Sequence, residues 1–163
     1  MIKVLLIILI TALPLHIYNQ GYITLFNSTP PQIKISGVTG TVYNPVVEQC
    51  DADPDITADG SKIDLKDPNK HRWVALSRDL LNVPKLAKKY KGLFMGPFKY
   101  GDTIIIVHPD KRLSGEWIVH DCMGNKITRG ILSGLYIRNS VDFLQGKDGF
   151  LGKWRGEIII IKK

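Results

Sequence analysis

The amino-acid sequence predicts an all-β domain with one short helix, and three observations lead to this prediction. Short apolar segments of strand length recur along the chain, turn-forming residues separate them, and only one stretch has the signals of a helix. The chain has 163 residues, of which 44% are hydrophobic, so it has the size and composition of a single globular domain. Many short strands with one helix are typical of a β-barrel.

The N-terminal segment differs in character from the rest of the chain. Lys3 precedes an apolar run from Val4 to Leu15 of about a dozen residues, whereas a membrane-spanning helix needs about twenty. Residues 1–18 are therefore expected to be a signal peptide. An uncleaved membrane anchor is the alternative, because no small-x-small cleavage site follows Leu15. Both predict an exported protein, periplasmic or extracellular, that meets a membrane only through this segment.

A linker and five strands are expected after this segment. Residues 19–36 form the linker, which the Pro30-Pro31 pair keeps extended, and residues 37–163 form the domain. Residues 32–36 alternate in polarity and are a candidate for an extra edge strand. Strands are expected at residues 38–43, 73–76, 103–107, 116–120 and 157–161. The last contains four consecutive isoleucines and is expected to close or cover the sheet.

One long loop and one helix are expected between these strands. Residues 48–68 are acidic and rich in turn-forming residues, which predicts an irregular loop. Ser77 is a suitable N-cap for a helix that starts near Arg78-Asp79. Pro84 is expected to interrupt or restart this helix before residues 86–90.

An ordered set of short segments between residues 37 and 144 resembles the three-aspartate (3D) domains. The segments are TVY at 41–43, TADG at 57–60, VALSRD at 74–79, GDTIII at 101–106, WIVHD at 117–121 and SVDFL at 140–144. Related domains occur in rare lipoprotein A, the MltA-type lytic transglycosylases, and the barwin-like endoglucanases and expansins. The resemblance implies a six-stranded double-psi β-barrel with acidic residues in one groove that handles cell-wall polysaccharide.

The chain departs from these families at three points. No cysteine follows the apolar run, so the lipid anchor of rare lipoprotein A is not expected. Cys122-Met123-Gly124 follows the second family aspartate, where the family has a small residue and a glycine. The interval from Asp121 to Asp142 is also longer than in the family, which predicts an inserted loop or helical turn within residues 125–139.

Asp142 and Asp121 are the candidate catalytic residues. Asp142 stands between Val141 and Phe143. Desolvation by apolar neighbours raises the pKa of a carboxyl group. A raised pKa keeps the group protonated near neutral pH, as a general acid must be. It matches the third family aspartate, which the resemblance implies is the acid of the transglycosylases. Asp121 matches the second and would bind substrate or tune Asp142. A solvent-facing strand-end aspartate and a turn-forming aspartate are the respective alternatives.

Five further residues are candidates for substrate binding. The resemblance implies that Thr41 and Tyr43 lie on the first strand, where a hydroxyl-bearing residue lines the groove. Alternation places both on one face of this strand, so both could contact a sugar. The resemblance places Asp59 in a turn that supports the groove, and Asp79 at the first family aspartate. An acid in the first turn of a helix favours a structural role for Asp79. Trp117 can stack on a sugar, although core filling is the default for tryptophan on a strand.

Cys50 and Cys122 are the only cysteines. An oxidising compartment permits a disulfide between them, and the closure of a loop of about seventy residues would stabilise the fold by a few kcal/mol. The resemblance places both cysteines near the groove. Two buried thiols are the alternative to the disulfide.

Charge and motif content narrow the expected partners. The net charge is +7, but the charges are dispersed apart from a lysine cluster at residues 85–91, and no aromatic-basic motif for nucleic acid accompanies them. No zinc-ligand pattern and no phosphate-binding glycine loop occur, so neither a metal nor a cofactor is expected. The expected partner is peptidoglycan or a related wall polysaccharide, and the protein is expected to be a monomer. The expected function is glycan-strand cleavage, with a non-catalytic, expansin-like wall module as the alternative.

Overall fold

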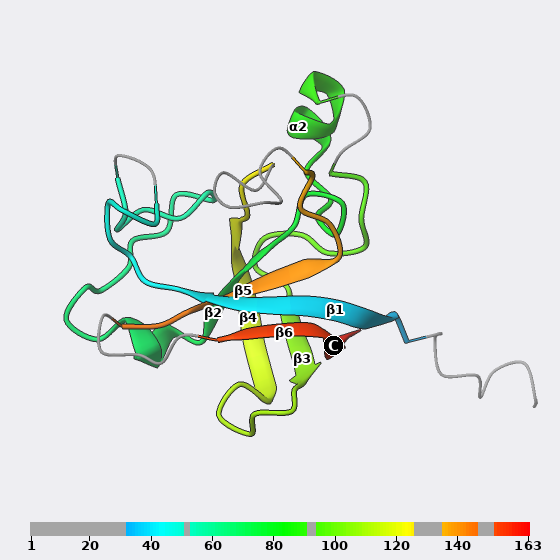
Figure 1. Cartoon of the computed structure of the whole chain (residues 1–163). Helices are drawn as coiled ribbons and strands as arrows, with labels where there is room; N and C mark the ends of the chain where they lie inside the picture. Colours follow the sequence, from blue (N-terminus) through cyan, green and yellow to red (C-terminus); the bar gives the residue numbers. More distant parts are fainter. Residues whose placement is uncertain (1–31, 51–52, 91–93, 126–134, 147–151) are drawn as a thin grey trace, which may run out of the picture. The chain divides into compact units, whose positions relative to one another are not determined.

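The computed structural model describes residues 32–50, 53–90, 94–125, 135–146 and 152–163. Residues 33–163 form one compact unit. The predicted export segment, most of the predicted linker and most of the predicted insertion lie outside the described residues. The elements, in chain order, are β1 (Lys34–Tyr43), a 3-10 helix η1 (Pro68–His71), β2 (Trp73–Leu76), α2 (Pro84–Lys89), β3 (Thr103–Val107), β4 (Gly115–Cys122), β5 (Ser140–Leu144) and β6 (Lys153–Lys162) (Figure 1).

The six strands form one sheet that closes on itself in the order β1-β5-β2-β4-β3-β6 (Figure 1). β1 runs parallel to β5 and β2 runs parallel to β4, whereas all other neighbours are antiparallel. Exchanging β1 with β4, β2 with β5 and β3 with β6 reproduces the same order and the same parallel and antiparallel pairs. The connectivity of the ring therefore has an internal two-fold symmetry.

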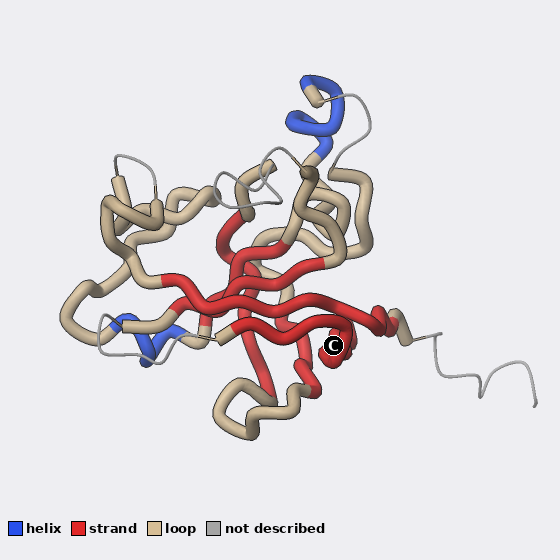
Figure 2. Tube along the Cα trace, viewed as in Figure 1, coloured by secondary structure: helices blue, strands red, loops and turns tan. Residues whose placement is uncertain are grey.

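The predicted strands are all present, and three of them are longer than expected (Figure 2). β1 begins at Lys34, and Lys34 and Ile35 pair with Ile161 and Ile160 of β6. Residues 34–36 therefore have the strand conformation that their alternation indicated, but they continue the first strand and form neither a separate edge strand nor part of a linker. β6 pairs with both β1 and β3, so the isoleucine-rich strand closes the ring.

The helix begins at Pro84, so the expectation that it starts near Arg78 is wrong. Ser77 does not act as its N-cap, because this side chain is buried and its Oγ accepts a hydrogen bond from the backbone N–H of Ser140 (3.0 Å). The chain after Ser77 lies instead along residues 94–98, where the Phe94 N–H donates to the Arg78 carbonyl (2.9 Å). Pro84 occupies the first helical turn, where its missing N–H leaves no bond unmade.

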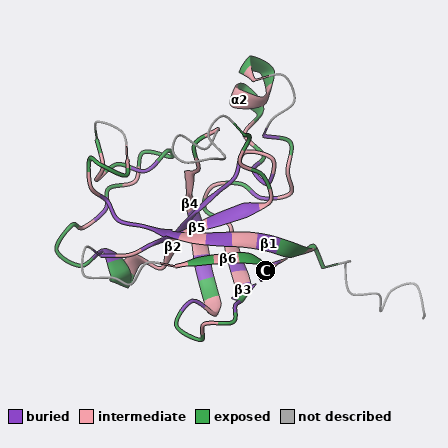
Figure 3. Ribbon diagram, in the orientation of Figure 1, coloured by how far each residue is buried: buried purple, intermediate pink, exposed green. Residues whose placement is uncertain are grey.

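Inward-facing side chains of the strands fill the interior of the ring. Figure 3 colours buried residues, and stretches of β5 and β1 are among them. Trp117 on β4 is 1% exposed, its indole N–H donates to the Leu113 carbonyl (2.8 Å), and its ring meets the edge of Phe143. Trp117 therefore belongs to the core, as is usual for tryptophan on a strand, and not to a sugar-binding surface.

His108 follows β3 and packs into this core. Its ring lies edge-on to Phe143 and Trp154, with centroid distances of 5.4 and 4.4 Å. Nδ1 accepts from the Asp110 N–H (2.8 Å), whereas Nε2 is buried and has no hydrogen-bond partner among the described residues. Burial lowers the pKa of this imidazole below its usual range, so the folded protein holds it neutral.

Acidification is therefore expected to destabilise the protein through His108. The unfolded chain takes up a proton at a pKa of about 6.5, and the folded chain does so only at a lower pH. The stability of the fold with neutral His108 is therefore fully present above the unfolded pKa of this residue, and it is lost as the pH falls below that value. The free energy of unfolding in urea should fall between pH 8 and pH 5 by less in His108→Asn than in the wild type. The amide oxygen of the variant can still accept the hydrogen bond from the Asp110 N–H. Equal losses in variant and wild type would contradict this role.

Candidate functional site

A row of directly paired residues crosses four neighbouring strands of the ring. Thr41 of β1 pairs with Asp142 of β5, Asp142 pairs with Ala75 of β2, and Ala75 pairs with Asp121 of β4. Directly opposed residues project from the same face of a sheet. The neighbouring positions Val42 and Phe143 belong to the interior core, so the row lies on the outer face.

A β-bulge in β4 places Asp121 on this outer face. Val74 pairs with Val119, but the next residue, Ala75, pairs with Asp121, so His120 is the extra residue. Under strict alternation Asp121 would face the interior together with Val119. The extra residue reverses the alternation after His120. The bulge is thus the reason why Asp121 and Asp142 share one face.

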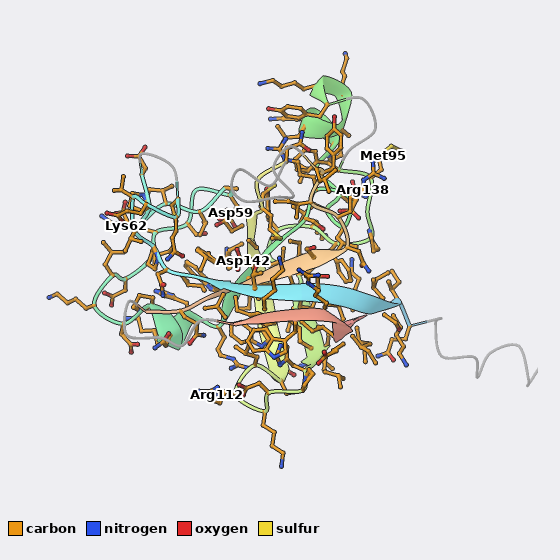
Figure 4. The ribbon with its side chains drawn as sticks, viewed as in Figure 1. Asp59, Lys62, Met95, Arg112, Arg138 and Asp142 are labelled. Carbon is orange, nitrogen blue, oxygen red and sulfur yellow. The ribbon has the colours of Figure 1, made fainter. Side chains whose placement is uncertain are left out.

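A pocket of about 480 Å³ lies over this row, which is a size typical of small-ligand sites. The loop that follows β1 and the end of β4 form its walls. Asp142 projects from β5 near the centre of Figure 4. The lining residues are Tyr43, Gln49, Cys50, Asp53, Pro54, Ile56, Thr57, Ala58, Ala75, Arg78, Asp121, Cys122, Met123, Gly124 and Asp142.

The carboxyl group of Asp142 is held and partly neutralised by its surroundings. Thr41 Oγ1 donates a hydrogen bond to Asp142 Oδ1 (2.8 Å). Burial raises the pKa of Asp142 to about 7, the negative charge of Asp121 adds to this effect, and the Thr41 hydrogen bond opposes it. A carboxyl group with this pKa is present in both protonation states near neutral pH, so it can donate a proton and take one back.

Hydrogen bonds fix the orientation of the Asp121 carboxylate. Oδ1 accepts from the backbone N–H groups of Ala58 (2.9 Å) and Cys122 (2.8 Å), and Oδ2 accepts from the Tyr43 hydroxyl (3.3 Å). Burial raises the pKa of Tyr43, and the Asp121 charge raises it further, so this phenol stays protonated and donates. Thr41 and Tyr43 therefore each hold one of the two aspartates, on the face that alternation predicted.

Asp59 supports the wall of the pocket and does not line it. Oδ1 accepts from Thr57 Oγ1 (2.6 Å) and the Ser61 N–H (3.0 Å), and Oδ2 pairs with His120 Nδ1 (2.6 Å). Burial opposes ionisation of Asp59, but these hydrogen bonds outweigh it and lower the pKa. Gly60 completes the predicted turn with a φ of 89°. This turn presents the neighbouring Ala58 N–H to Asp121.

Asp79 also lies outside the pocket lining. Its Oδ2 accepts from the Asn139 N–H (3.0 Å), just before β5 begins. Because no helix starts at Arg78, the expected interaction of Asp79 with a helix dipole does not occur. Asp79 instead joins the chain after β2 to the chain before β5, which is a structural role.

Cys50 and Cys122 both line the pocket, as the resemblance implied, but no disulfide joins them. The Cys50 thiol donates to the Asn44 carbonyl (3.5 Å) and the Cys122 thiol to the Met123 carbonyl (3.4 Å). Burial raises the pKa of Cys122, so its thiol stays protonated near neutral pH. In this structure both cysteines are half-buried thiols.

Arg78 is a pocket residue that sequence reasoning did not select. The available signal was its position directly before the first family aspartate. The expected helix would have placed Arg78 on an exposed first turn, which concealed its position in the site.

No family model matches this chain, and a search of curated proteins finds no significant match. Within the described ranges, no helix combines the length and the apolar character needed to cross a membrane. The same residues contain no group of three or more histidine, cysteine or acidic side chains that could hold a metal ion.

Proposed function

We propose that the ring is a double-psi β-barrel of the three-aspartate type and that its pocket cleaves the glycan strand of peptidoglycan. Two interlocked parallel pairs, β1 with β5 and β2 with β4, support the proposed barrel type. The proposal includes export of the protein, as the resemblance implies. One observation carries the activity: Asp142 is a half-buried carboxyl group on the pocket with a pKa of about 7.

Asp142 would act first as an acid and then as a base. Its proton passes to the glycosidic oxygen, the bond from that oxygen to the muramyl C1 breaks, and a positively charged sugar remains. The Asp142 carboxylate then removes the proton of the muramyl 6-hydroxyl, whose oxygen attacks C1 and forms a 1,6-anhydro product. No water is consumed, and Asp142 ends protonated as it began. A single acid suffices, unlike the two carboxyl groups of most glycosidases.

The neighbouring groups would position this acid and stabilise charge. The Thr41 hydrogen bond orients the Asp142 carboxyl. The Asp121 carboxylate lies on the same face and would offset the positive charge that develops on the sugar. These are the roles expected of Thr41 and Asp121 in the proposed reaction.

A non-catalytic, expansin-like wall-binding module is the second candidate. One observation favours it: Asp121 already accepts hydrogen bonds from Tyr43, Ala58 and Cys122, as a structural carboxylate does. In that case the pocket binds glycan, and Asp142 contributes a hydrogen bond and no proton transfer.

Mass spectrometry of the soluble products from purified peptidoglycan tests the proposal. Anhydromuropeptides are expected with the full chain, and Asp142→Asn should reduce them by about 100-fold or more. Asp67→Asn, an isosteric change at an exposed position, should release them at the wild-type rate. Reducing-end products would indicate hydrolysis. Protein that pellets with the sacculi but releases no product would indicate a binding module, and a protein that does neither would overturn the proposal.

A further inference from the structure

Arg78 is a cation that aromatic rings hold in the proposed glycan pocket. It follows β2 and lines the same pocket as Asp121 and Asp142. Its guanidinium carbon lies 4.9 Å from the ring centre of Tyr90 and 5.4 Å from that of Phe94. Stacking on aromatic rings fixes the orientation of a guanidinium group without neutralising its charge.

The charge of Arg78 has no carboxylate counter-ion among the described residues. None of the ion pairs that these residues form includes Arg78. Its Nε is buried and has no hydrogen-bond partner among them. The guanidinium acts on the thiol of Cys122, whose pKa burial raises and the Arg78 charge lowers, but a neutral thiol is no counter-ion. The positive charge of Arg78 in the pocket lining is therefore available to an anionic group of a ligand.

The other charges of the pocket indicate what kind of ligand group Arg78 could bind. The lining contains Asp53, Asp121 and Asp142, and Arg78 is the single basic residue among the described lining residues. A neutral sugar needs no cation at this position, whereas an anionic sugar would be repelled by the carboxylates unless a cation lay beside them. Guanidinium groups bind carboxylates in a bidentate geometry that is also selective.

We infer that Arg78 binds a carboxylate of the ligand, so that the pocket selects glycan segments with a free carboxylate beside the sugar at Asp142. The inference rests on the proposed glycan site and adds a specificity residue to it. In peptidoglycan such a carboxylate belongs to the stem peptide, or to the lactyl group of a muramyl residue that carries no peptide, and the same chemistry would recognise both.

Binding of chemically defined glycan strands to the full chain tests the inference by calorimetry. The probes are soluble peptidoglycan strands with their carboxyl groups intact, and the same strands with these groups converted to amides. The wild-type protein should bind the intact strands about tenfold or more tightly, which is a typical contribution of a charge-assisted pair. Peptide-free strands, whose lactyl carboxylates are free, form a third arm: retained binding shows that a lactyl carboxylate is recognised, and lost binding assigns the recognised carboxylate to the peptide.

Substitutions then assign the preference to Arg78. Arg78→Met keeps an elongated apolar side chain and should bind intact and amidated strands equally, whereas Arg78→Lys should keep part of the preference. Arg155→Met, which removes the same charge from an exposed position on β6, should keep all of it.

The outcomes separate this inference from the proposed function. Equal binding of intact and amidated strands by the wild type would overturn the role of Arg78 and leave the glycan site standing. A preference that survives in Arg78→Met would also overturn it. Failure to bind any of the three strands would remove the proposed glycan site itself.

Discussion

Asp142→Asn is expected to stabilise the protein by a few kcal/mol at pH 8. In the unfolded chain this carboxyl ionises at a pKa near 3.8, whereas the folded protein raises the pKa to about 7. Each pKa unit corresponds to about 1.4 kcal/mol. Because the folded pKa is the higher one, the contribution of Asp142 to stability is fully present below pH 4 and is lost as the pH rises through 7. An amide carries no charge to bury, and its oxygen can still accept the Thr41 hydrogen bond.

Urea unfolding at about pH 4, pH 6 and pH 8 measures this effect. The stability advantage of Asp142→Asn over the wild type should grow across the series and level off above pH 7. Asp67→Asn, at an exposed position, should follow the wild-type curve. Parallel curves for Asp142→Asn and wild type would show that the folded protein does not disfavour the ionised carboxyl. Functional sites often contain titratable groups with a strongly shifted pKa, and such groups reduce the stability of the fold.

Gly96→Ala is expected to be among the most destabilising single changes in the described part of the chain. A Cβ at this position would lie 2.1 Å from the carbonyl carbon of Leu80 and 2.3 Å from its oxygen. These are backbone atoms, so no side-chain rotation relieves the contact. Overpacking of this kind costs about 1–3 kcal/mol and occasionally more. The segment that would have to move includes Arg78, so ligand binding should weaken as well.

Thermal denaturation compares this variant with Gly146→Ala. A Cβ at Gly146 would meet only side-chain atoms of Asn69 and Pro68, the nearest at 3.5 Å, which is ordinary contact. The control should therefore change stability by less than about 1 kcal/mol. If Gly96→Ala and Gly146→Ala have the same melting temperature, the close approach of the Gly96 and Leu80 backbones does not exist in solution.

The strands were predictable because their signal is local. Val38 and Val42 recur on one face of β1, and the structure buries both. The run of isoleucines identified β6 as a strand without indicating which face is buried, and the structure buries Ile158 and Ile160. The helix start was not predictable in the same way. Ser77 has the local signature of an N-cap, but its hydroxyl meets the Ser140 N–H, 63 residues further along the chain. Tertiary pairing therefore outweighed a local preference.

The candidate site was partly predictable for a related reason. Alternation predicted that Thr41 and Tyr43 share one face of their strand, but not that Thr41 bonds Asp142 and Tyr43 bonds Asp121, because those contacts depend on which strands pair. The bulge at His120 was not visible in the sequence, because a bulge is a property of two paired strands. Arg78 was missed because its place depends on the chain that packs against residues 78–82 rather than on its own neighbours.

The two parallel pairs of the ring also determine how late the site can form. Thr41 and Asp142, which share a hydrogen bond, are 101 residues apart in the sequence. Such distant pairings require long loops to close before any contact offsets the lost entropy, so they slow folding. β6 is the last of the six strands in chain order, and it is the neighbour of both β1 and β3 in the ring. Until β6 has paired, the sheet therefore has two open edges, β1 and β3, and unpaired edges of this kind expose a folding chain to aggregation.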